Sequence, residues 1–157
     1  MADIKRQVNP LFLRDGDLRQ VMELMYFAYR RFTGEADGIL AEKGLGRAHH
    51  RALYFIGRHP SMTVKELLEI LQITKQSLAR VLKALIEKGL VLSQEGDQDR
   101  RERWLTLTAK GEELEADVAQ AQMRLLRETF LSEGPRSVEG FRSVMMGFLS
   151  VDERMRF

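Results

Sequence analysis

The middle third of the chain constrains the fold most, because the spacing of its apolar residues changes part-way along it. Thr63 with Glu66, and Thr74 before a second apolar run, have the pattern of helix N-caps. They predict two short helices separated by about three residues. After Gly89 the pattern changes to short apolar runs on either side of a charged stretch at 94–103, which predicts a β-hairpin with a long tip. This order of elements is that of a helix-turn-helix followed by a wing.

Helices are predicted on both sides of this segment. One begins near Asp17, where Asp17 and Gln20 have the pattern of a capping box, and a second covers about 47–58. A helix of about 20 residues follows Thr108, a break at 132–135 ends it, and a last helix carries an apolar stripe. We therefore expect a mainly α fold with a small β-hairpin wing, in which a winged helix-turn-helix lobe lies between N- and C-terminal helices.

Composition narrows the class of protein. The chain has 157 residues and no cysteine, which excludes a disulfide framework, a cysteine-ligated zinc site and a thiol switch. No apolar run approaches the roughly 20 residues that cross a bilayer, and the N-terminus lacks the apolar stretch of a signal peptide. We therefore expect a cytoplasmic protein of one domain that does not enter a membrane.

The net charge of +2 is small, but it is unevenly distributed along the chain. Residues 1–46 contain 7 basic and 7 acidic residues, residues 47–103 contain 11 and 7, and residues 104–157 contain 7 and 9. The excess of positive charge therefore falls on the middle segment, which also contains all three histidines. A basic segment between neutral and acidic ones is expected of a protein that binds nucleic-acid phosphates, although chance clustering explains it equally well.

The predicted helix at 74–88 separates an apolar face from a polar one. The apolar stripe contains Leu78, Val81, Leu82, Leu85 and Ile86. The opposite face contains Gln76, Arg80 and Lys83, and the N-terminal end contains Thr74, Lys75 and Ser77. A helix that enters the major groove needs this division, because arginine and glutamine side chains pair with guanine and adenine edges. The alternative is an ordinary amphipathic helix with a solvated basic face.

The predicted hairpin tip concentrates arginines. Arg100, Arg101 and Arg103 lie within four residues, which suits insertion into a narrow, A·T-rich minor groove. Asp99 precedes them, and we expect its carboxylate to hold one of the arginines in place. The alternative is a charged loop that contributes only to solubility.

Two stretches resemble the MarR family of regulators. The first resembles the family's recognition helix and first wing strand, and reads Ile73-Thr74-Lys75-Gln76-Ser77-Leu78-Ala79-Arg80, with Gly89-Leu90-Val91 after it. The second is similar to the family's wing signature, and reads Asp97-x-Asp99-Arg100-Arg101, with Leu105-Thr106-Leu107-Thr108 after it. The specific part of the resemblance covers about 63–108, and the order of the predicted helices extends it over nearly the whole chain.

The resemblance implies roles for parts of the chain. A lobe at 47–108 would bind double-stranded DNA, and helices at 11–46 and 109–157 would hold two copies together as a homodimer. Arg101 would enter the minor groove, with Asp99 as its orienting partner. Gln76, Ser77 and Arg80 would face the major groove, with Thr74 and Lys75 near phosphates. The implied function is a ligand-responsive repressor on an inverted-repeat operator.

Effectors of this family are commonly phenols or other aromatic acids, so the resemblance also implies a pocket between the arms and the lobe. The nearby candidates are Tyr26, Tyr29, Arg30, His49, His50, Arg51 and Tyr54. Arg30 or a histidine would pair with a carboxylate, although aromatic residues at helical spacing are more often part of a core. His49 and His50 point about 100° apart on a helix, which favours a capping or DNA-facing role over a shared metal ion. We expect no metal and no other cofactor.

Two other functions are open at this point. A winged-helix module that binds only proteins would share the fold without contacting DNA. A small enzyme is the least favoured, since no phosphate-binding glycine loop, Ser/His/Asp arrangement or pair of catalytic carboxylates stands out. Gly44-Leu45-Gly46 lacks the strand context and the third glycine of a dinucleotide motif.

Overall fold

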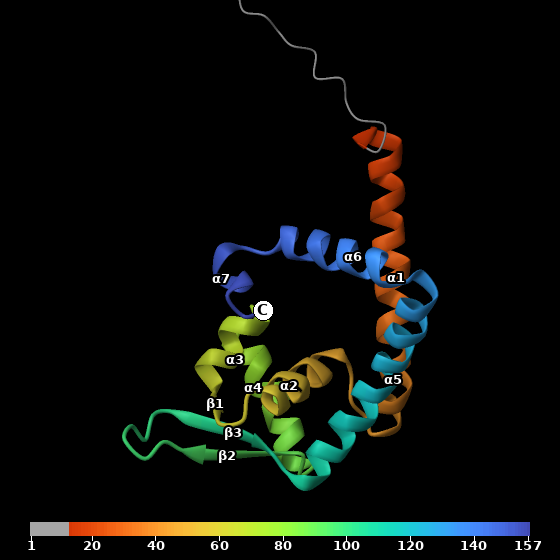
Figure 1. Ribbon diagram of the computed structural model, residues 1–157. Coiled ribbons are helices and arrows are strands. Elements are labelled where there is room, and N and C mark those ends of the chain that lie inside the picture. The colour runs from red at the N-terminus through yellow and green to blue at the C-terminus, as the bar shows by residue number, and fades with distance from the viewer. Residues whose placement is uncertain (1–12) are drawn as a thin grey trace, which may run out of the picture.

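The computed structural model describes residues 13–157, so residues 11 and 12 of the expected N-terminal arm lie outside it. The elements are α1 (Asp15–Glu42), α2 (Arg47–Arg58), β1 (Met62–Thr63), α3 (Val64–Leu71), α4 (Lys75–Glu87), β2 (Val91–Glu95), β3 (Arg103–Leu107), α5 (Ala109–Glu133), α6 (Pro135–Phe148) and α7 (Val151–Arg154). Helices α2 to α4 and the strands form a lobe, from which α1 and α5 extend, and α6 crosses above it (Figure 1). This is the mainly α fold with a small wing that the sequence predicts.

The helix-turn-helix forms where the capping signals predict it. The Thr63 Oγ1 accepts a hydrogen bond from the Glu66 N–H at 3.1 Å, and the Glu66 carboxylate accepts one from the Thr63 N–H at 2.6 Å, so α3 begins with a complete capping box. Thr74 caps α4, since its Oγ1 accepts from the N–H of Ser77 at 3.1 Å. Between the helices, Gln72 adopts a left-handed conformation with φ of 52°, which turns the chain. With eight residues, α3 is the short helix that the sequence predicts.

The core of the lobe is made of aliphatic side chains from all of its elements and from both arms. The largest fully buried side chains are those of Leu40, Leu53, Ile56, Leu67, Leu78, Leu85, Val91, Leu105 and Val118. The predicted apolar stripe of α4 is confirmed for its first four residues, whereas Ile86 at its end is 42% exposed. Because α4 buries this stripe, its polar face points away from the core.

The predicted hairpin is confirmed, with β2 and β3 paired antiparallel from Val91↔Leu107 to Glu95↔Arg103. The tip is therefore 96–102, shorter than predicted, because both strands extend into the charged stretch. A third strand, β1, pairs with β3 and gives the sheet the order β1-β3-β2. This strand was not predicted, since two residues are too few to show an alternating pattern.

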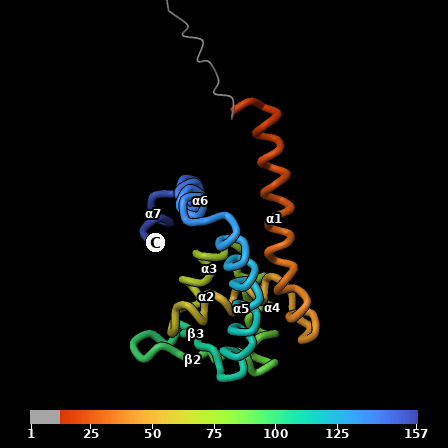
Figure 2. Tube along the Cα trace, turned by 45° about the vertical axis from the view of Figure 1, so that its right-hand side comes forward, coloured from red at the N-terminus to blue at the C-terminus, as the bar shows by residue number. Residues whose placement is uncertain are grey.

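The arms contain two long helices that run side by side, α1 and α5 (Figure 2). The helix begins at Asp15, close to the predicted start near Asp17. The predicted capping box of Asp17 and Gln20 is wrong, because the N-cap is Arg14, which makes no side-chain capping bond. Asp17 is thus inside the first turn, where a negative charge is favourable at the positive end of the helix dipole. Only Thr33, Ala36 and Leu40 of α1 are buried.

The C-terminal half of the chain follows the prediction with one addition. α5 ends at Glu133, and Pro135 is the first residue of α6, where its fixed φ suits a helix start. The predicted last helix ends at Phe148, and the short helix α7 after it was not predicted. No helix within 13–157 is both long and apolar enough to cross a bilayer.

The start of α5 is joined tightly to the end of α4. The Thr108 Oγ1 donates to the carbonyl of Gly89 at 2.6 Å, and the Thr108 N–H donates to the carbonyl of Leu90 at 3.0 Å. Gly111 is buried against the same Leu90 carbonyl, so closely that a Cβ on residue 111 would overlap it. α4, β2 and α5 therefore meet in one junction with no room for a side chain at position 111.

Candidate nucleic-acid interface

The polar face of α4 is available for contacts outside the chain. Gln76, Arg80 and Lys83 are all exposed. Lys83 forms an i,i+4 ion pair with Glu87 at 3.8 Å, in which both side chains are largely exposed. In the part of the chain that the structure describes, no hydrogen bond or ion pair engages the Arg80 side chain. All the guanidinium donors of Arg80 are therefore free to bind a partner.

The N-terminal end of α4 combines a cap with positive charge. Ser77 is half-buried, and its Oγ accepts a hydrogen bond from the Thr74 Oγ1 at 2.9 Å while its N–H donates back to that oxygen. Ser77 is thus primarily part of the cap. Lys75 is exposed at the first position of the helix, so its ammonium adds to the positive end of the helix dipole. Such an end favours a phosphate group.

The hairpin of β2 and β3 projects from the lobe as a wing (Figure 1). Arg100 and Arg101 are exposed, whereas Arg103 forms an ion pair with Glu95 across the hairpin at 3.8 Å. The Asp99 carboxylate accepts a hydrogen bond from the backbone N–H of Arg101 at 2.9 Å. The structure therefore places Asp99 on the backbone of the tip and not on a guanidinium, so Asp99 shapes the turn that presents the arginines.

Gly96 begins the tip, and the sequence reasoning missed its role. Its N–H donates to the carbonyl of Glu102 at 3.0 Å. A Cβ at this position would lie 2.8 Å from the carbonyl oxygen of Asp99 and 2.9 Å from the Trp104 Nε1. An isolated glycine next to a strand is a signal for such a close approach. The tip therefore closes only because residue 96 has no side chain.

Replacing Gly96 with alanine is expected to open the tip, because the added methyl group displaces the indole or the backbone at Asp99. Trp104 is the single tryptophan of the chain, so its fluorescence reports this change directly. We expect a shifted emission maximum for Gly96→Ala and an unchanged one for Gly140→Ala, since a Cβ at residue 140 meets nothing within 4 Å. Identical spectra for the wild type and Gly96→Ala would contradict this account of the tip.

Comparisons with known proteins agree with this geometry. A sequence model of the MarR family matches residues 43–102. The HTH-type transcriptional regulator PetP of Rhodobacter capsulatus is 49% identical over 146 residues, which cover 93% of this chain and 87% of PetP. The chain belongs to the MarR family. It is a winged helix-turn-helix transcriptional regulator, and its relatives are regulators, not enzymes, as the sequence predicts.

Solved structures of MarR-family proteins share the fold. FabT of Streptococcus pneumoniae, solved in complex with DNA, has a TM-score of 0.76 at 17% identity, over 83% of this chain and 94% of FabT. A MarR protein of Staphylococcus aureus, solved in complex with salicylate and kanamycin, has a TM-score of 0.66 at 22% identity, over 84% of this chain and 92% of that one. The arrangement of lobe and arms is therefore that of the MarR fold.

The seven residues expected near an effector lie along α1 and α2. All of them are exposed or half-buried in the single chain: Tyr26, Tyr29, Arg30, His49, His50, Arg51 and Tyr54. Arg51 donates to the Tyr29 hydroxyl at 3.0 Å, which links the two helices. The Arg30 guanidinium lies over the ring of Phe27, 4.9 Å from its centroid, where a cation–π interaction holds it.

An ion pair that the sequence reasoning missed also links α1 to α2. The Arg47 side chain donates to the Asp37 carboxylate through its Nε at 3.2 Å and its Nη2 at 2.9 Å. The hydrogen bonds from Arg47 hold the pKa of Asp37 below its ordinary value. No local pattern signals this pair, because the two residues are ten positions apart across a turn.

His49 caps α2, which confirms the capping interpretation for this residue. Its Nδ1 accepts a hydrogen bond from the backbone N–H of Gly46 at 3.1 Å, so this nitrogen carries no proton. Burial, and to a smaller extent the nearby Lys88, lower the pKa of His49. Burial also lowers the pKa of His50, although Asp37 opposes this shift. Both histidines are therefore neutral in the folded chain near neutral pH.

Acid is expected to destabilise the protein through these two histidines. Their folded-state pKa values lie below the ordinary 6.5, so the unfolded chain binds more protons between the two values. Their contribution to stability is therefore complete above pH 6.5 and is lost as the pH falls from 6.5 toward the folded values. Urea denaturation at a series of pH values tests this, and His49→Gln/His50→Gln should reduce the slope of stability against pH between pH 7 and 5. An unchanged slope would exclude these histidines as its source.

Proposed function

We propose that this MarR-family regulator recognises a specific double-stranded operator through α4 and the wing. The observation that supports this most directly is the free, exposed Arg80 on the outer face of α4. Gln76, Ser77 and Arg80 would face the major groove, with Lys83 on the same side of the helix and Thr74 and Lys75 near phosphates. Arg100, Arg101 and Arg103 would approach the minor groove from the tip that Asp99 shapes. The DNA complex of FabT supports this proposal by likeness of fold.

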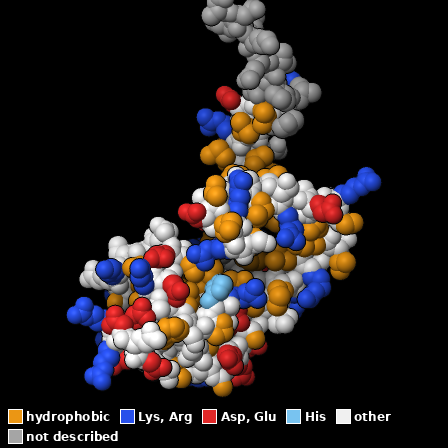
Figure 3. Space-filling model, turned by 60° about the vertical axis from the view of Figure 1, so that its left-hand side comes forward, with side chains coloured by type: hydrophobic (Ala, Val, Ile, Leu, Met, Phe, Trp, Pro, Cys, Tyr) orange, Lys and Arg blue, Asp and Glu red, His pale blue; other side chains and the backbone are white. Residues whose placement is uncertain are grey.

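We also propose that the protein acts as a homodimer, with a DNA-binding lobe at 47–108 and dimerisation helices at 11–46 and 109–157. Large apolar side chains are exposed along the N-terminal half of α1 and along α6: Leu18, Val21, Met22, Leu24, Met25, Phe27, Phe141, Val144, Met145 and Phe148. Hydrophobic side chains line the projecting end of α1 in the space-filling view (Figure 3). Large apolar side chains exposed in this number along two helices indicate an interface, and a second copy offers the same surfaces to it.

Regulation by a ligand is the third part of the proposal. An aromatic or phenolic acid would bind between the arms and the lobe near Tyr26, Tyr29, Arg30, His49, His50, Arg51 and Tyr54. A ligand that prefers a dimer with a different spacing of the lobes lowers the affinity for DNA, by as much as its affinities for the two states differ. The salicylate complex of the Staphylococcus aureus protein supports this by likeness of fold. The protein would then act in the cytoplasm as a repressor that its ligand releases from DNA.

Selection from random-sequence duplex DNA tests the DNA-binding proposal. We expect an enriched inverted repeat with half-site centres about 10 base pairs apart. The logarithm of the association constant should fall steeply with the logarithm of the salt concentration, since each neutralised phosphate releases counterions. A module that binds only proteins would enrich no sequence, and an asymmetric single site would contradict binding as a dimer.

Charge placed on the apolar face of α6 should abolish the dimer. The variant Met145→Glu/Phe148→Glu introduces two carboxylates into the proposed interface, where burial without a partner is costly. Sedimentation equilibrium should give twice the chain mass of 18.1 kDa for the wild type and one chain mass for the variant. Leu92→Glu is the matched control, because Leu92 is 51% exposed on the wing and away from the arms. A dimeric double variant would place the interface elsewhere.

A further inference from the structure

A hollow of about 300 Å³ lies where the ends of α1 and α4 meet the first turns of α5. Its floor contains Leu90 and Leu114, which are 3% and 6% exposed. Its rim contains Lys43, Lys88, Lys110, Glu113 and Asp117. None of these residues belongs to the proposed DNA-binding face or to the effector candidates on α1 and α2, so the hollow is a separate feature of the chain.

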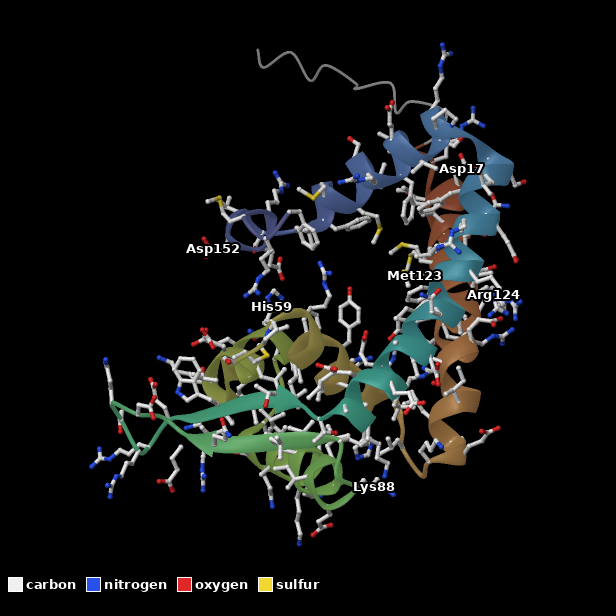
Figure 4. The ribbon with its side chains drawn as sticks, turned by 60° about the horizontal axis from the view of Figure 1, so that its bottom comes forward. Asp17, His59, Lys88, Met123, Arg124 and Asp152 are labelled. Carbon is white, nitrogen blue, oxygen red and sulfur yellow. The ribbon has the colours of Figure 1, made fainter. Side chains whose placement is uncertain are left out.

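The unpaired charges of the rim come from different elements: the cations follow α1 and α4, and the anions lie on α5. Lys43 and Lys88 directly follow the last residues of α1 and α4, and Lys88 lies near the turn into α5 (Figure 4). Glu113 and Asp117 are four residues apart on α5, so their side chains share one face of that helix. The Lys110 Nζ is already engaged, because it donates to the Lys88 carbonyl at 3.0 Å.

The four remaining charges have no partner within the chain. Within residues 13–157, no ion pair of 4.0 Å or less and no hydrogen bond engages the Lys43 or Lys88 ammonium or the Glu113 or Asp117 carboxylate. The two cations and the two anions border the same hollow, and no cation among them lies within 4.0 Å of an anion. A ligand that carries both charges would pair with both sets at once.

Ligands with a single charge fit the rim less well. A simple anion would pair with Lys43 and Lys88 but would be repelled by the two carboxylates. A metal ion would find only two carboxylates, and no group of three metal-binding side chains exists in the described part of the chain. We propose that the hollow binds a zwitterionic α-amino acid with an apolar side chain. Its carboxylate pairs with Lys43 and Lys88, its ammonium with Glu113 and Asp117, and its side chain packs on Leu90 and Leu114.

The helices that line the hollow indicate how a bound ligand would change the contacts between them. They come from α1, α4 and α5, beside the junction of Thr108 and Gly111 with the end of α4. A bound amino acid would add a bridge across the same junction, and would therefore hold the end of α4 against both arms. This binding does not depend on the proposed DNA function, and a direct binding measurement tests it by itself.

Isothermal titration calorimetry of the full chain with L-leucine, 4-methylpentanoate and 3-methylbutylamine tests the proposal. The second probe lacks the ammonium of leucine and the third lacks its carboxylate. We expect saturable binding of leucine, with each analogue about fivefold weaker or more, as expected for the loss of a partly solvated ion pair. No binding of leucine at millimolar concentrations would overturn the proposal, and so would equal binding of 4-methylpentanoate, which would indicate a simple anion site.

Two variants test which rim side chain binds the ammonium of the ligand and which binds its carboxylate. Asp117→Asn should weaken leucine and 3-methylbutylamine but not 4-methylpentanoate, whereas Lys88→Met should weaken leucine and 4-methylpentanoate but not 3-methylbutylamine. Lys65→Met removes an exposed lysine of α3 outside the hollow and should change none of the three affinities. Thermal unfolding of each variant checks that it is folded. If neither rim variant changes leucine binding, leucine binds elsewhere and the proposed site is wrong.

Discussion

Replacing Arg80 with alanine should weaken binding to the selected operator by about a hundredfold or more, because one bidentate arginine–guanine contact is worth about 1–3 kcal/mol and the proposed dimer loses one such contact in each half-site. Arg80 is exposed on the outer face of α4, and no partner within the described residues competes for its guanidinium. The loss should be confined to one base position of each half-site, where the variant no longer prefers guanine. Arg80→Lys keeps the charge without the planar fork, so it should recover non-specific binding but little of the specificity.

Arg101→Ala should weaken binding in a different way. In the proposed complex the wing would read the shape of the minor groove. This variant should therefore lose its preference for narrow A·T-rich flanks while it keeps the preference at the bases that α4 would contact. Fluorescence anisotropy at fixed salt measures both arginine variants, and sedimentation checks that each is still a dimer. Operator affinities equal to that of the wild type in both variants would refute the assignment of these two arginines.

Replacing Gly111 with alanine is expected to have the largest effect on stability. The added Cβ would overlap the carbonyl oxygen of Leu90, which belongs to backbone and cannot rotate away. Relief requires α5 to move from the end of α4, which strains the Thr108 hydrogen bonds to Gly89 and Leu90. We expect a loss of about 3 kcal/mol or more in the free energy of unfolding, at the upper end of the cost of overpacking.

Urea denaturation at one fixed protomer concentration measures this loss, since association of two copies makes apparent stability depend on concentration. Gly38→Ala is the matched control, because Gly38 lies inside α1 and a Cβ on it meets nothing within 4 Å. It should raise stability by about 0.5–1 kcal/mol through helix propensity. A Gly111→Ala variant as stable as the wild type would show that α5 is not fixed to α4 in the way described.

The elements whose boundaries were predicted well are those with signals local to the backbone. Thr63 and Thr74 each accept a backbone hydrogen bond at the start of a helix with their own hydroxyl oxygen, and each has the predicted role in the structure. The capping box predicted at Asp17 is not formed, because α1 begins two residues earlier, at Asp15. Acidic residues are favourable at N-caps and within first turns alike, so the pattern does not distinguish the two.

Features that depend on contacts between residues far apart in the sequence could not be predicted from the sequence. Three features join segments that are apart in the sequence and adjacent only in the folded chain. They are the Asp37–Arg47 ion pair, the pairing of β1 with β3 and the contact of Gly111 with Leu90. On the candidate interface, helical periodicity was enough to predict which side of α4 is exposed. It could not predict that Asp99 binds a backbone N–H, because that depends on the conformation of the tip.

Helix α1 consists of two parts that differ in what supports them. It has 28 residues, yet its buried side chains all lie within the last ten positions. A solitary helical segment of the remaining length is only marginally stable in water. In the proposed dimer, ordering of this segment and pairing of the two copies are consequently a single event. Such a regulator would respond to its own concentration. At low concentration the copies would separate, and no dimer interface would then fix the distance between the two DNA-binding lobes.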